Sequence, residues 1–449
     1  MAAGEAAPVR GNADGPDAAR AARAALADQM RDSALAGRAV EAAFRAVPRH
    51  LFVPEMAPDQ AYQDEAFVIK CDADGLPVSS SSQPAMMAIM LEQLGLSAGQ
   101  RVLEIGTGTG YNAALMTHIV GDPRAVVTVD IDPGLVRRAA ASLAAAGYGG
   151  VRVSCGDGGL GVAEHAPYDR IILTVGAWDI APQWLAQLAP GGRLVLPLSV
   201  RGIQLSVALE RAGDHWASRS ACRCGFIKMV GAFAGPESFV PLGPQPGLRA
   251  QADDGRPLDA GALYQALTGA VTDMPTALRS AGLAEAGDLD LWLTLTEPDL
   301  TRLTLMGTRS GHVSRNPLMP MGGLAGTGGP AGQLGAAAIL SARQTPEPGR
   351  EPDGELEPGR EPEPSGEPEL GADARPGEIV VRGYGPGGAG LAGYLAGRAQ
   401  IWQGLGRPGT SGLRLSAYPA GTPAKQAEGA IVIDRRHVRL ALGWPPALP

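Results

Sequence analysis

The sequence has few aromatic residues and few cysteines, and it lacks long hydrophobic runs. Aromatic residues make up 4% of the 449 residues, so the core must be built mainly from Ala, Leu, Val and Ile. Four cysteines in a chain of this length exclude a disulfide scaffold and are typical of a reducing compartment, so we expect a cytoplasmic protein. No apolar run approaches the roughly 18 residues of a membrane-spanning helix, and residues 1–16 lack the apolar stretch of a signal peptide.

A long basic cluster is also absent, which argues against nucleic-acid binding through phosphate contacts. The net charge of −8 is concentrated between Glu347 and Glu369, where nine acids stand against two arginines and proline recurs every few residues. Proline blocks helices and sheet ladders, and like charges extend a chain. We therefore predict a disordered spacer over residues 344–372.

The remaining sequence predicts two folded units. Between residues 101 and 209, short β-branched runs alternate with helical stretches, which is typical of an α/β fold with a doubly wound, Rossmann-like parallel sheet. An Ala-rich helical segment precedes it, and strand and helix patterns on both sides of the spacer predict a second, α+β unit. We expect a disordered tail over 1–16, an α/β domain over 17–236, and an extension made of 237–343 and 373–449.

A glycine-rich loop follows the first strand of the α/β domain, reading Val-Leu-Glu-Ile-Gly-Thr-Gly-Thr-Gly-Tyr at residues 102–111. Glycine lets the backbone turn tightly and approach a ligand closely. A dinucleotide fold requires G-x-G-x-x-G, with its third glycine where this chain has Tyr111. The pattern instead resembles the S-adenosylmethionine (AdoMet) loop of class I methyltransferases. On that resemblance the candidate cofactor contacts are Glu104, Gly106, Thr107, Gly108, Gly110 and Tyr111.

Two further motifs stand at the ends of the next two strands. Asp130 ends a β-branched run twenty residues after Gly110, which is the placement of an acid that accepts hydrogen bonds from ribose hydroxyls. The third strand is followed by a Gly-Asp-Gly motif that is placed to meet an adenine amino group. These motifs occur in the order that an AdoMet site requires, and they add as candidate contacts Asp130, Ile131, Gly156, Asp157 and Gly158.

Longer motifs make the resemblance more specific. Residues 46–54 read Ala-Val-Pro-Arg-His-Leu-Phe-Val-Pro, residues 82–84 read Ser-Gln-Pro, and residues 188–197 read Leu-Ala-Pro-Gly-Gly-Arg-Leu-Val-Leu-Pro. Over residues 40–233 the chain resembles the protein L-isoaspartate O-methyltransferases. This resemblance implies a class I methyltransferase fold, AdoMet as cofactor, and a peptide or protein carrying Asp or isoAsp as substrate. It implies no nucleic-acid or membrane partner, and we expect a monomer.

The chemistry that this resemblance implies needs few catalytic groups. A carboxylate is ionised at neutral pH and needs no general base, so catalysis is mainly orientation and exclusion of water. Ser82, with Ser81, is the candidate to hold the accepting carboxylate, and Ser82 also fits a helix cap before Pro84. Cys222 and Cys224 offer only two thiols, and we predict no metal site. The candidate substrate contacts are Ser80, Gln83, Val175 and Trp178.

Two segments depart from the family pattern. Residues 80–84 read Ser-Ser-Ser-Gln-Pro where the repair enzymes usually have Thr-Ile-Ser-Gln-Pro, and residues 176–179 read Gly-Ala-Trp-Asp in place of Ala-Ala-Pro. With these two segments and the extension, the chain resembles actinobacterial homologues that act on aspartate in ribosomally made lanthipeptides or graspetides. The resemblance implies that the aspartate becomes a methyl ester and then a succinimide. That is the leading interpretation. The alternatives are general isoaspartyl protein repair and a non-catalytic AdoMet-fold subunit that presents a peptide to another enzyme.

Overall fold

Helices dominate the N-terminal end of the chain in the computed structural model, which describes residues 16–449 except 74, 237, 245–248, 253–254, 256, 281–282, 298–299, 307–322, 327–335, 345–376, 423–429 and 446–449. Helices α1 (Pro16–Asp32), α2 (Arg38–Ala46) and α3 (Pro58–Ala61) pack together, and the hairpin of β1 (Phe67–Cys71) and β2 (Pro77–Ser81) leads into α4 (Pro84–Leu94). The predicted tail over 1–16 lies outside the described residues except for Pro16, which begins α1.

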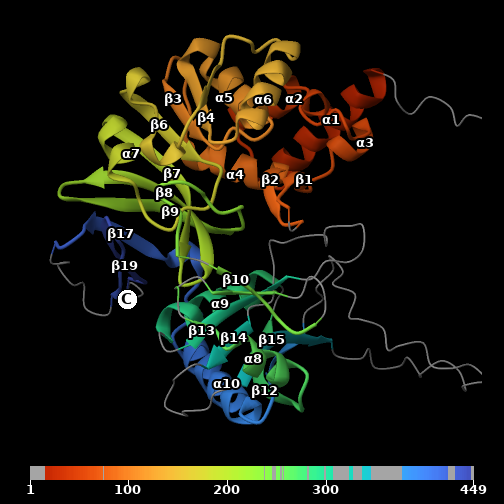
Figure 1. The fold of residues 1–449 in the computed structure, drawn as a ribbon, viewed down its shortest axis with the longest axis vertical. Coiled ribbons are helices and arrows are strands. Elements are labelled where there is room, and N and C mark those ends of the chain that lie inside the picture. The colour runs from red at the N-terminus through yellow and green to blue at the C-terminus, as the bar shows by residue number, and fades with distance from the viewer. Residues whose placement is uncertain are drawn as a thin grey trace, which may run out of the picture.

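A ten-stranded sheet forms the centre of the upper part of the molecule (Figure 1). Its strand order is β18-β19-β17-β9-β8-β7-β6-β3-β4-β5, and the five strands from β7 to β5 are parallel. This confirms the predicted doubly wound α/β sheet. The parallel strands and their helices are β3 (Val102–Ile105), α5 (Tyr111–Val120), β4 (Val126–Asp130), α6 (Pro133–Ala145), β5 (Arg152–Cys155), β6 (Tyr168–Leu173), α7 (Pro182–Gln187) and β7 (Leu188–Val200).

The two faces of this sheet are covered by separate apolar cores. Successive strand residues point to opposite faces, so Val102 joins the core beneath α4, α5 and the N-terminal helices, whereas Leu103 joins the core on the α7 side. The antiparallel strands β8 (Ile203–Ala212) and β9 (His215–Cys224) then extend the sheet beyond β7.

A second, seven-stranded antiparallel sheet forms the lower part, in the order β10-β11-β13-β14-β15-β16-β12. β15 pairs directly with β16, with Gln344 opposite Gly377. The predicted acidic spacer over 344–372 therefore connects two neighbouring strands; its first residue, Gln344, ends β15, and the rest lies outside the described residues. The elements are β10 (Ser238–Pro241), β11 (Arg249–Ala252), α8 (Ala260–Leu267), β12 (Val271–Ser280), α9 (Leu283–Thr296), β13 (Leu300–Met306), β14 (Gly323–Gly326), β15 (Ala336–Gln344), β16 (Gly377–Tyr384) and α10 (Gly388–Gly404).

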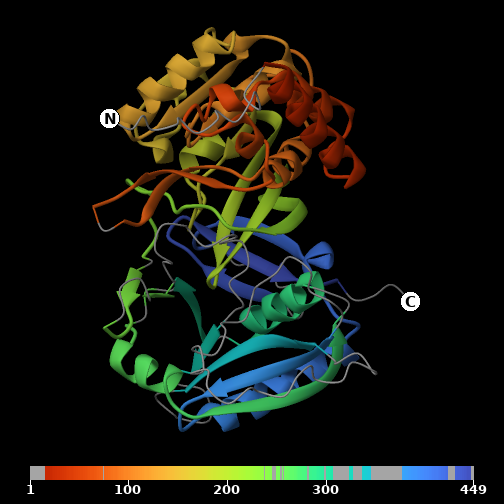
Figure 2. The same cartoon turned by 90° about the vertical axis from the view of Figure 1, so that its right-hand side faces the viewer.

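Helix α9 joins the two parts, and Figures 1 and 2 both show it at the junction between the sheets. Leu291 and Leu295 belong to the core of the ten-stranded sheet. Leu289 and Leu293, on another side of the helix, pack instead into the core around α10. Arg223 of β9 adds an ion pair of 2.9 Å with Asp290. The helix is therefore buried on two sides, and the parts share apolar surface.

The last strands differ from the expected arrangement. The sequence predicted that residues 373–449 belong to the extension as a unit, but β17 (Arg414–Pro419) pairs with β9 of the upper sheet, with Ser416 opposite Ala217. β19 (Val438–Gly443) pairs with β17, and β18 (Ile431–Asp434) with β19. The physical reason is that β9 would otherwise present an unpaired edge. The boundary at residue 236 stays a prediction.

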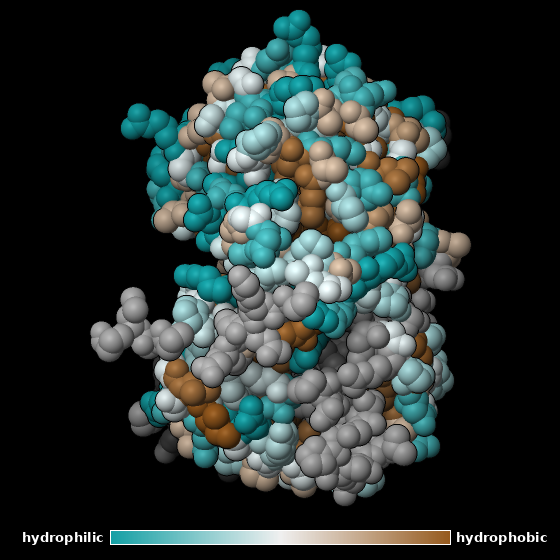
Figure 3. Space-filling model, turned by 90° about the vertical axis from the view of Figure 1, so that its left-hand side faces the viewer, coloured by the Kyte–Doolittle hydropathy of each residue, from teal (hydrophilic) through white to brown (hydrophobic). Residues whose placement is uncertain are grey.

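The surface on the side of α7 and β17 is mixed, with hydrophobic residues gathered in small groups among hydrophilic ones (Figure 3). Among the residues that the structure describes, no helix has the length and apolar character to cross a membrane.

Candidate active site

The motifs singled out in the sequence meet at one edge of the ten-stranded sheet. β3, β4, β5 and β6 are parallel neighbours, so the segments that follow them emerge side by side. These segments are 106–111, 130–132, 156–158 and 174–179.

The glycine loop has a left-handed backbone at each of its three glycines, with φ of 101° at Gly106, 52° at Gly108 and 85° at Gly110. A Cβ on Gly106 would lie 2.7 Å from the Thr174 hydroxyl, and one on Gly110 would lie 3.3 Å from Ala139 Cβ. Gly108 is different, because a Cβ there would meet only the Ser80 carbonyl, at 3.5 Å. Two glycines therefore allow close packing, while the position of a Cβ on Gly108 is open except for the Ser80 carbonyl.

The Asp130 carboxylate is fixed beside the glycine loop by two backbone hydrogen bonds. One of its oxygens accepts a hydrogen bond of 3.1 Å from the Gly108 N–H, and the other accepts one of 3.1 Å from the Asp132 N–H. Each carboxylate oxygen has a second lone pair. Asp130 can therefore accept bonds from a diol, while the neighbouring Ile131 is 43% exposed and offers an apolar contact beside it.

Three of the candidate cofactor residues turn their side chains into the core. Glu104 is fully buried, and its oxygens accept hydrogen bonds from Thr128 (2.7 Å) and Asn112 (2.8 Å). Burial raises the pKa of Glu104 to about 7, although these two hydrogen bonds oppose the rise. Thr107 and Tyr111 are 4% and 1% exposed. Any contact of these three residues with a ligand in the loop therefore goes through the backbone.

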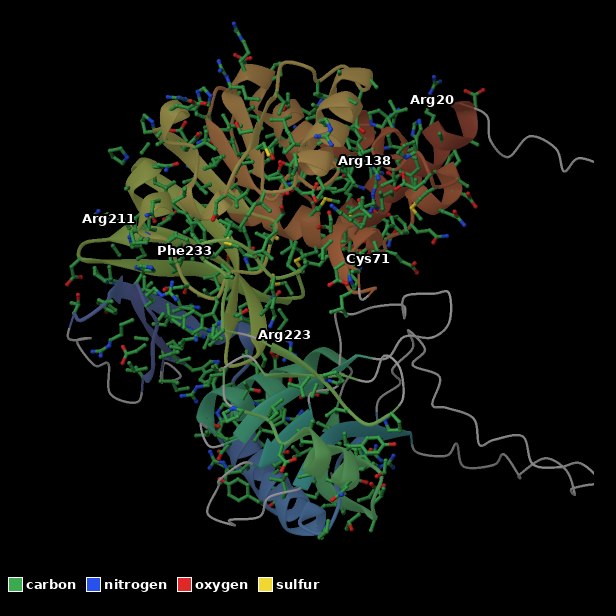
Figure 4. The ribbon with its side chains drawn as sticks, in the orientation of Figure 1. Arg20, Cys71, Arg138, Arg211, Arg223 and Phe233 are labelled. Atoms are coloured by element: carbon green, nitrogen blue, oxygen red, sulfur yellow. The ribbon has the colours of Figure 1, made fainter. Side chains whose placement is uncertain are left out.

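The Gly-Asp-Gly motif is held from outside by a strap, residues 229–234, that follows β9. Asp157 accepts hydrogen bonds from the Gly159 N–H (2.8 Å) and from the strap's Ala232 N–H (2.7 Å). The Trp184 indole donates to the Gly158 carbonyl at 2.9 Å. Phe233 of the strap, labelled in Figure 4, packs against Trp184 with ring centroids 6.0 Å apart. The motif is thus a rigid loop with its backbone fixed on two sides.

The β1–β2 hairpin crosses the glycine loop from the opposite side, and Figure 4 shows Cys71 near its tip. Lys70 of this hairpin forms an ion pair with Asp132, the cap of α6. Ser81 is 3% exposed, and the Gln83 amide donates to Asp64. The Ser82 hydroxyl, by contrast, makes no hydrogen bond to any residue within the described ranges. Of the three predicted serines in this segment, Ser81 has its hydroxyl engaged by Arg49, whereas Ser80 and Ser82 are partly exposed and could each offer a hydroxyl to a substrate.

Arg49 is a site residue that the sequence analysis did not assign. Its fully buried guanidinium donates to the carbonyls of Gln63 (3.1 Å), Glu65 (3.2 Å) and Ser82 (3.0 Å) and to the Ser81 hydroxyl (3.3 Å). No carboxylate within the described ranges lies within ion-pair distance, and burial lowers the pKa of Arg49 to about 10. The side chain therefore stays charged at neutral pH. Its signal in the sequence was its place in the motif at 46–54.

The segment after β6 forms the remaining side of the site. Val175 lies against the glycine loop, since its Cγ1 would be 2.9 Å from a Cβ on Gly106. Trp178 is half-buried, its indole N–H has no hydrogen-bond partner within the described ranges, and the Arg435 guanidinium lies 4.2 Å from its ring centroid. The predicted substrate contact Val175 thus lies beside Gly106, and the predicted contact Trp178 lies against Arg435.

Metal-ligating side chains do not gather in the described part of the chain, where no group of three His, Cys, Asp or Glu residues could hold an ion. Cys222 is largely buried, and burial raises the pKa of its thiol to about 11. His50 bonds to the Tyr62 hydroxyl at 2.8 Å.

Comparison with known proteins gives consistent matches to one family. The family model described as protein-L-isoaspartate(D-aspartate) O-methyltransferase (PCMT) matches residues 21–233. Protein-L-isoaspartate O-methyltransferase 1 of Archaeoglobus fulgidus is 45% identical over 220 residues, which cover 49% of this chain and 96% of that protein. Protein-L-isoaspartate O-methyltransferase 2 of the same organism is 44% identical over 189 residues, covering 42% and 83%.

Two of the similar solved structures carry descriptions of this kind. A protein-L-isoaspartate O-methyltransferase, 21% identical, aligns over 88% of this chain and 96% of its own, with a TM-score of 0.45. A putative enzyme of this kind from Plasmodium falciparum, in complex with S-adenosyl-L-homocysteine, is 17% identical over 46% of this chain and 98% of its own, with a TM-score of 0.40.

Proposed function

Because this chain belongs to the protein-L-isoaspartate(D-aspartate) O-methyltransferase family, we propose that it uses AdoMet to methylate a carboxylate of an isoaspartyl or aspartyl residue in a peptide or protein. The observation that carries the proposal is the meeting of the glycine loop, Asp130 and the Gly-Asp-Gly motif at one edge of the sheet, with the Ser80 carbonyl beside Gly108.

The residues at the sheet edge fit the cofactor. Gly108 leaves a Cβ position open beside the Ser80 carbonyl, Asp130 offers two acceptor oxygens for ribose hydroxyls, and residues 156–158 form a rigid loop for the adenine. Bound AdoMet supplies an activated methyl group on a sulfonium. The protein's part is to orient the acceptor and to exclude water.

The acceptor carboxylate needs positive potential and a donor, and the β1–β2 side of the site offers both. Ser82 has a free hydroxyl, and its carbonyl accepts a hydrogen bond of 3.0 Å from the charged Arg49. A charge held in a low-dielectric environment acts more strongly than one in water. We therefore assign Ser82 to hold the carboxylate and Arg49 to fix the backbone of residues 81–82 and keep the pocket attractive to an anion.

The test is incubation of the full chain and AdoMet with an isoaspartyl peptide, and with the same peptide carrying aspartate. We expect the mass of one added methylene on a carboxylate, followed by loss of methanol to give a succinimide. Ser82→Ala should slow the first step and leave the second unchanged. A stable methyl group on nitrogen, or on a small molecule, would contradict the proposal.

A narrower substrate is a second candidate: aspartate in a ribosomally made, modified peptide. It is favoured by the departures at 80–81 and 176–179 and by the extension beyond the 21–233 match. A precursor encoded beside a lanthipeptide cyclase or an ATP-grasp gene would be methylated faster than an isoaspartyl test peptide if this candidate is right. The non-catalytic alternative is disfavoured by the intact glycine loop and Asp130, and it predicts no methyl transfer to either substrate.

A further inference from the structure

The turn that connects β18 to β19, residues 435–437, lies against the predicted substrate wall of the site. The guanidinium carbon of Arg435 lies 4.2 Å from the centroid of the Trp178 ring, and the guanidinium donates a hydrogen bond of 3.0 Å to the Ser199 carbonyl. The guanidinium is therefore held between a strand of the upper sheet and the indole. A cation over the face of tryptophan is attracted by the ring's electrons, more strongly when water is excluded.

A second contact of this turn fixes the backbone next to Trp178. Asp179 is 4% exposed, and its carboxylate accepts hydrogen bonds of 2.8 Å from the His437 N–H and from the Ile180 N–H. If a buried carboxylate loses such a partner, no hydrogen bond offsets the free-energy cost of removing it from water. The chain around Trp178 and Asp179 is therefore tied to residues about 260 positions further along the sequence.

The same turn also reaches the Gly-Asp-Gly side of the site. The His437 ring packs against Phe233 at 5.2 Å between centroids, and Phe233 packs against Trp184, whose indole donates to Gly158. The turn thus contacts the Trp178–Asp179 segment directly and the Gly-Asp-Gly loop through Phe233 and Trp184, although it comes from strands that the family match does not include.

We propose that the C-terminal turn 435–437 is a positioning element of the active site, in which Arg435 holds Trp178 as the wall against which the substrate peptide packs. The proposal rests on the proposed methyl transfer. Arg435 acts through Trp178, whereas the Asp130 carboxylate is held by the backbone of Gly108 and Asp132. Its loss should therefore weaken peptide binding and leave cofactor binding intact.

The experiment compares Arg435→Ala with Arg439→Ala in the full chain. Arg439 belongs to the same hairpin and pairs with Asp434, away from Trp178, so it is a matched control. We expect Arg435→Ala to raise the KM for the isoaspartyl peptide by roughly tenfold, the effect of one buried cation–π contact and hydrogen bond. The AdoMet affinity and kcat should stay near the wild-type values, Arg439→Ala should change none of them, and Arg435→Lys should restore part of the KM.

A variant pair separates positioning from loss of folding. In the Trp178→Leu background, which removes the aromatic ring, Arg435→Ala should add little to the KM, because the contact through which it acts is already lost. Equal effects of Arg435→Ala in both backgrounds would overturn the proposal, as would a KM that does not move.

Hydrogen exchange supplies a readout that does not depend on activity. Amides of residues 175–181 should exchange faster in Arg435→Ala than in Arg439→Ala, and unchanged exchange there would contradict the positioning role. If the wild-type chain methylates no carboxylate, the proposed function fails, while the exchange experiment still decides whether Arg435 holds this segment.

Discussion

The backbone N–H of Gly108 donates to the carboxylate of Asp130 across 3.1 Å, so the glycine loop and the predicted ribose-binding acid form one hydrogen-bonded unit. Gly108 follows β3 and Asp130 ends β4. These strands are parallel neighbours, although the two residues are 22 positions apart in the sequence. This bond orients the Asp130 carboxylate before a ligand arrives. Ligand binding therefore costs little conformational entropy at this residue.

Asp130→Ala should weaken AdoMet binding by one or more orders of magnitude, because two charge-assisted hydrogen bonds to a ribose, each worth about 1.5–3 kcal/mol, would be lost. Titration calorimetry measures the affinity, and the melting temperature checks the fold. Asp122→Ala, at a surface turn before β4, is the control and should leave the affinity unchanged. Equal affinity in Asp130→Ala would remove Asp130 from the site.

Arg49→Met should cost both stability and activity. The substitution leaves the carbonyls of Gln63, Glu65 and Ser82 without their buried donor, and each lost partner costs about 1–3 kcal/mol. Urea unfolding measures the stability, and methyl transfer is compared at a temperature where the variant is folded. Arg38→Ala, on the exposed side of α2, should change neither. Full activity in folded Arg49→Met would exclude a role in the pocket.

Because of Glu104, the protein should be more stable at pH 4.5 than at pH 7. Its pKa is raised to about 7 in the folded state, so the folded state holds a proton that the unfolded chain releases above its ordinary pKa of 4.5. The contribution of this proton to the free energy of unfolding is fully present below pH 4.5. It is lost as the pH rises to about 7, which lowers the free energy of unfolding by roughly 3 kcal/mol. Urea midpoints in that window measure it, and Glu104→Gln should flatten the slope. A wild-type slope that persists in the variant would contradict the assignment.

Replacing residues 345–376 by a short Gly/Ser turn should leave stability and turnover nearly unchanged. β15 and β16 are already antiparallel partners, with Gln344 opposite Gly377, so a tight connection can join them. Loop-closure cost falls slowly with shorter loops, so any change in the melting temperature should be small and upward. A large loss of turnover would show that the acidic segment takes part in substrate selection.

Truncation after residue 236 should give an unstable or aggregating fragment. It removes Leu291 and Leu295 from the core of the upper sheet and uncovers the β9 edge that pairs with β17. Exposed apolar surface and an open edge both favour association. Size-exclusion chromatography of the fragment measures this, and a soluble monomer that binds AdoMet would contradict it.

The sequence anticipated those parts of the fold and site whose signal is local. The glycine loop and Asp130 could be located because a buried strand, a turn and a helix follow within a few residues. Ser81 and Gln83 were singled out by motif, but their side chains serve internal contacts, which no spacing reveals. Arg49 went unassigned because its partners lie 14 to 33 residues away and are mostly backbone carbonyls.

Other elements had no usable pattern. β1, β2, β9 and β12 were not predicted, since β2, for example, is largely serine, which has little β propensity. In α9, Leu289, Leu291, Leu293 and Leu295 alternate and show no helical period, because the helix is buried on two sides. The pairing of β17 with β9 joins residues about 200 positions apart, beyond the reach of any local signal.

That pairing also sets an order of events during synthesis. Until β17 and the turn at residues 435–437 have been translated, β9 has an open edge and Trp178 lacks the turn that backs it. Contacts of such sequence separation form late and slowly. The last strands to be translated therefore close the β9 edge and back Trp178, so a chain stalled before β17 would expose the same open edge as the truncated fragment.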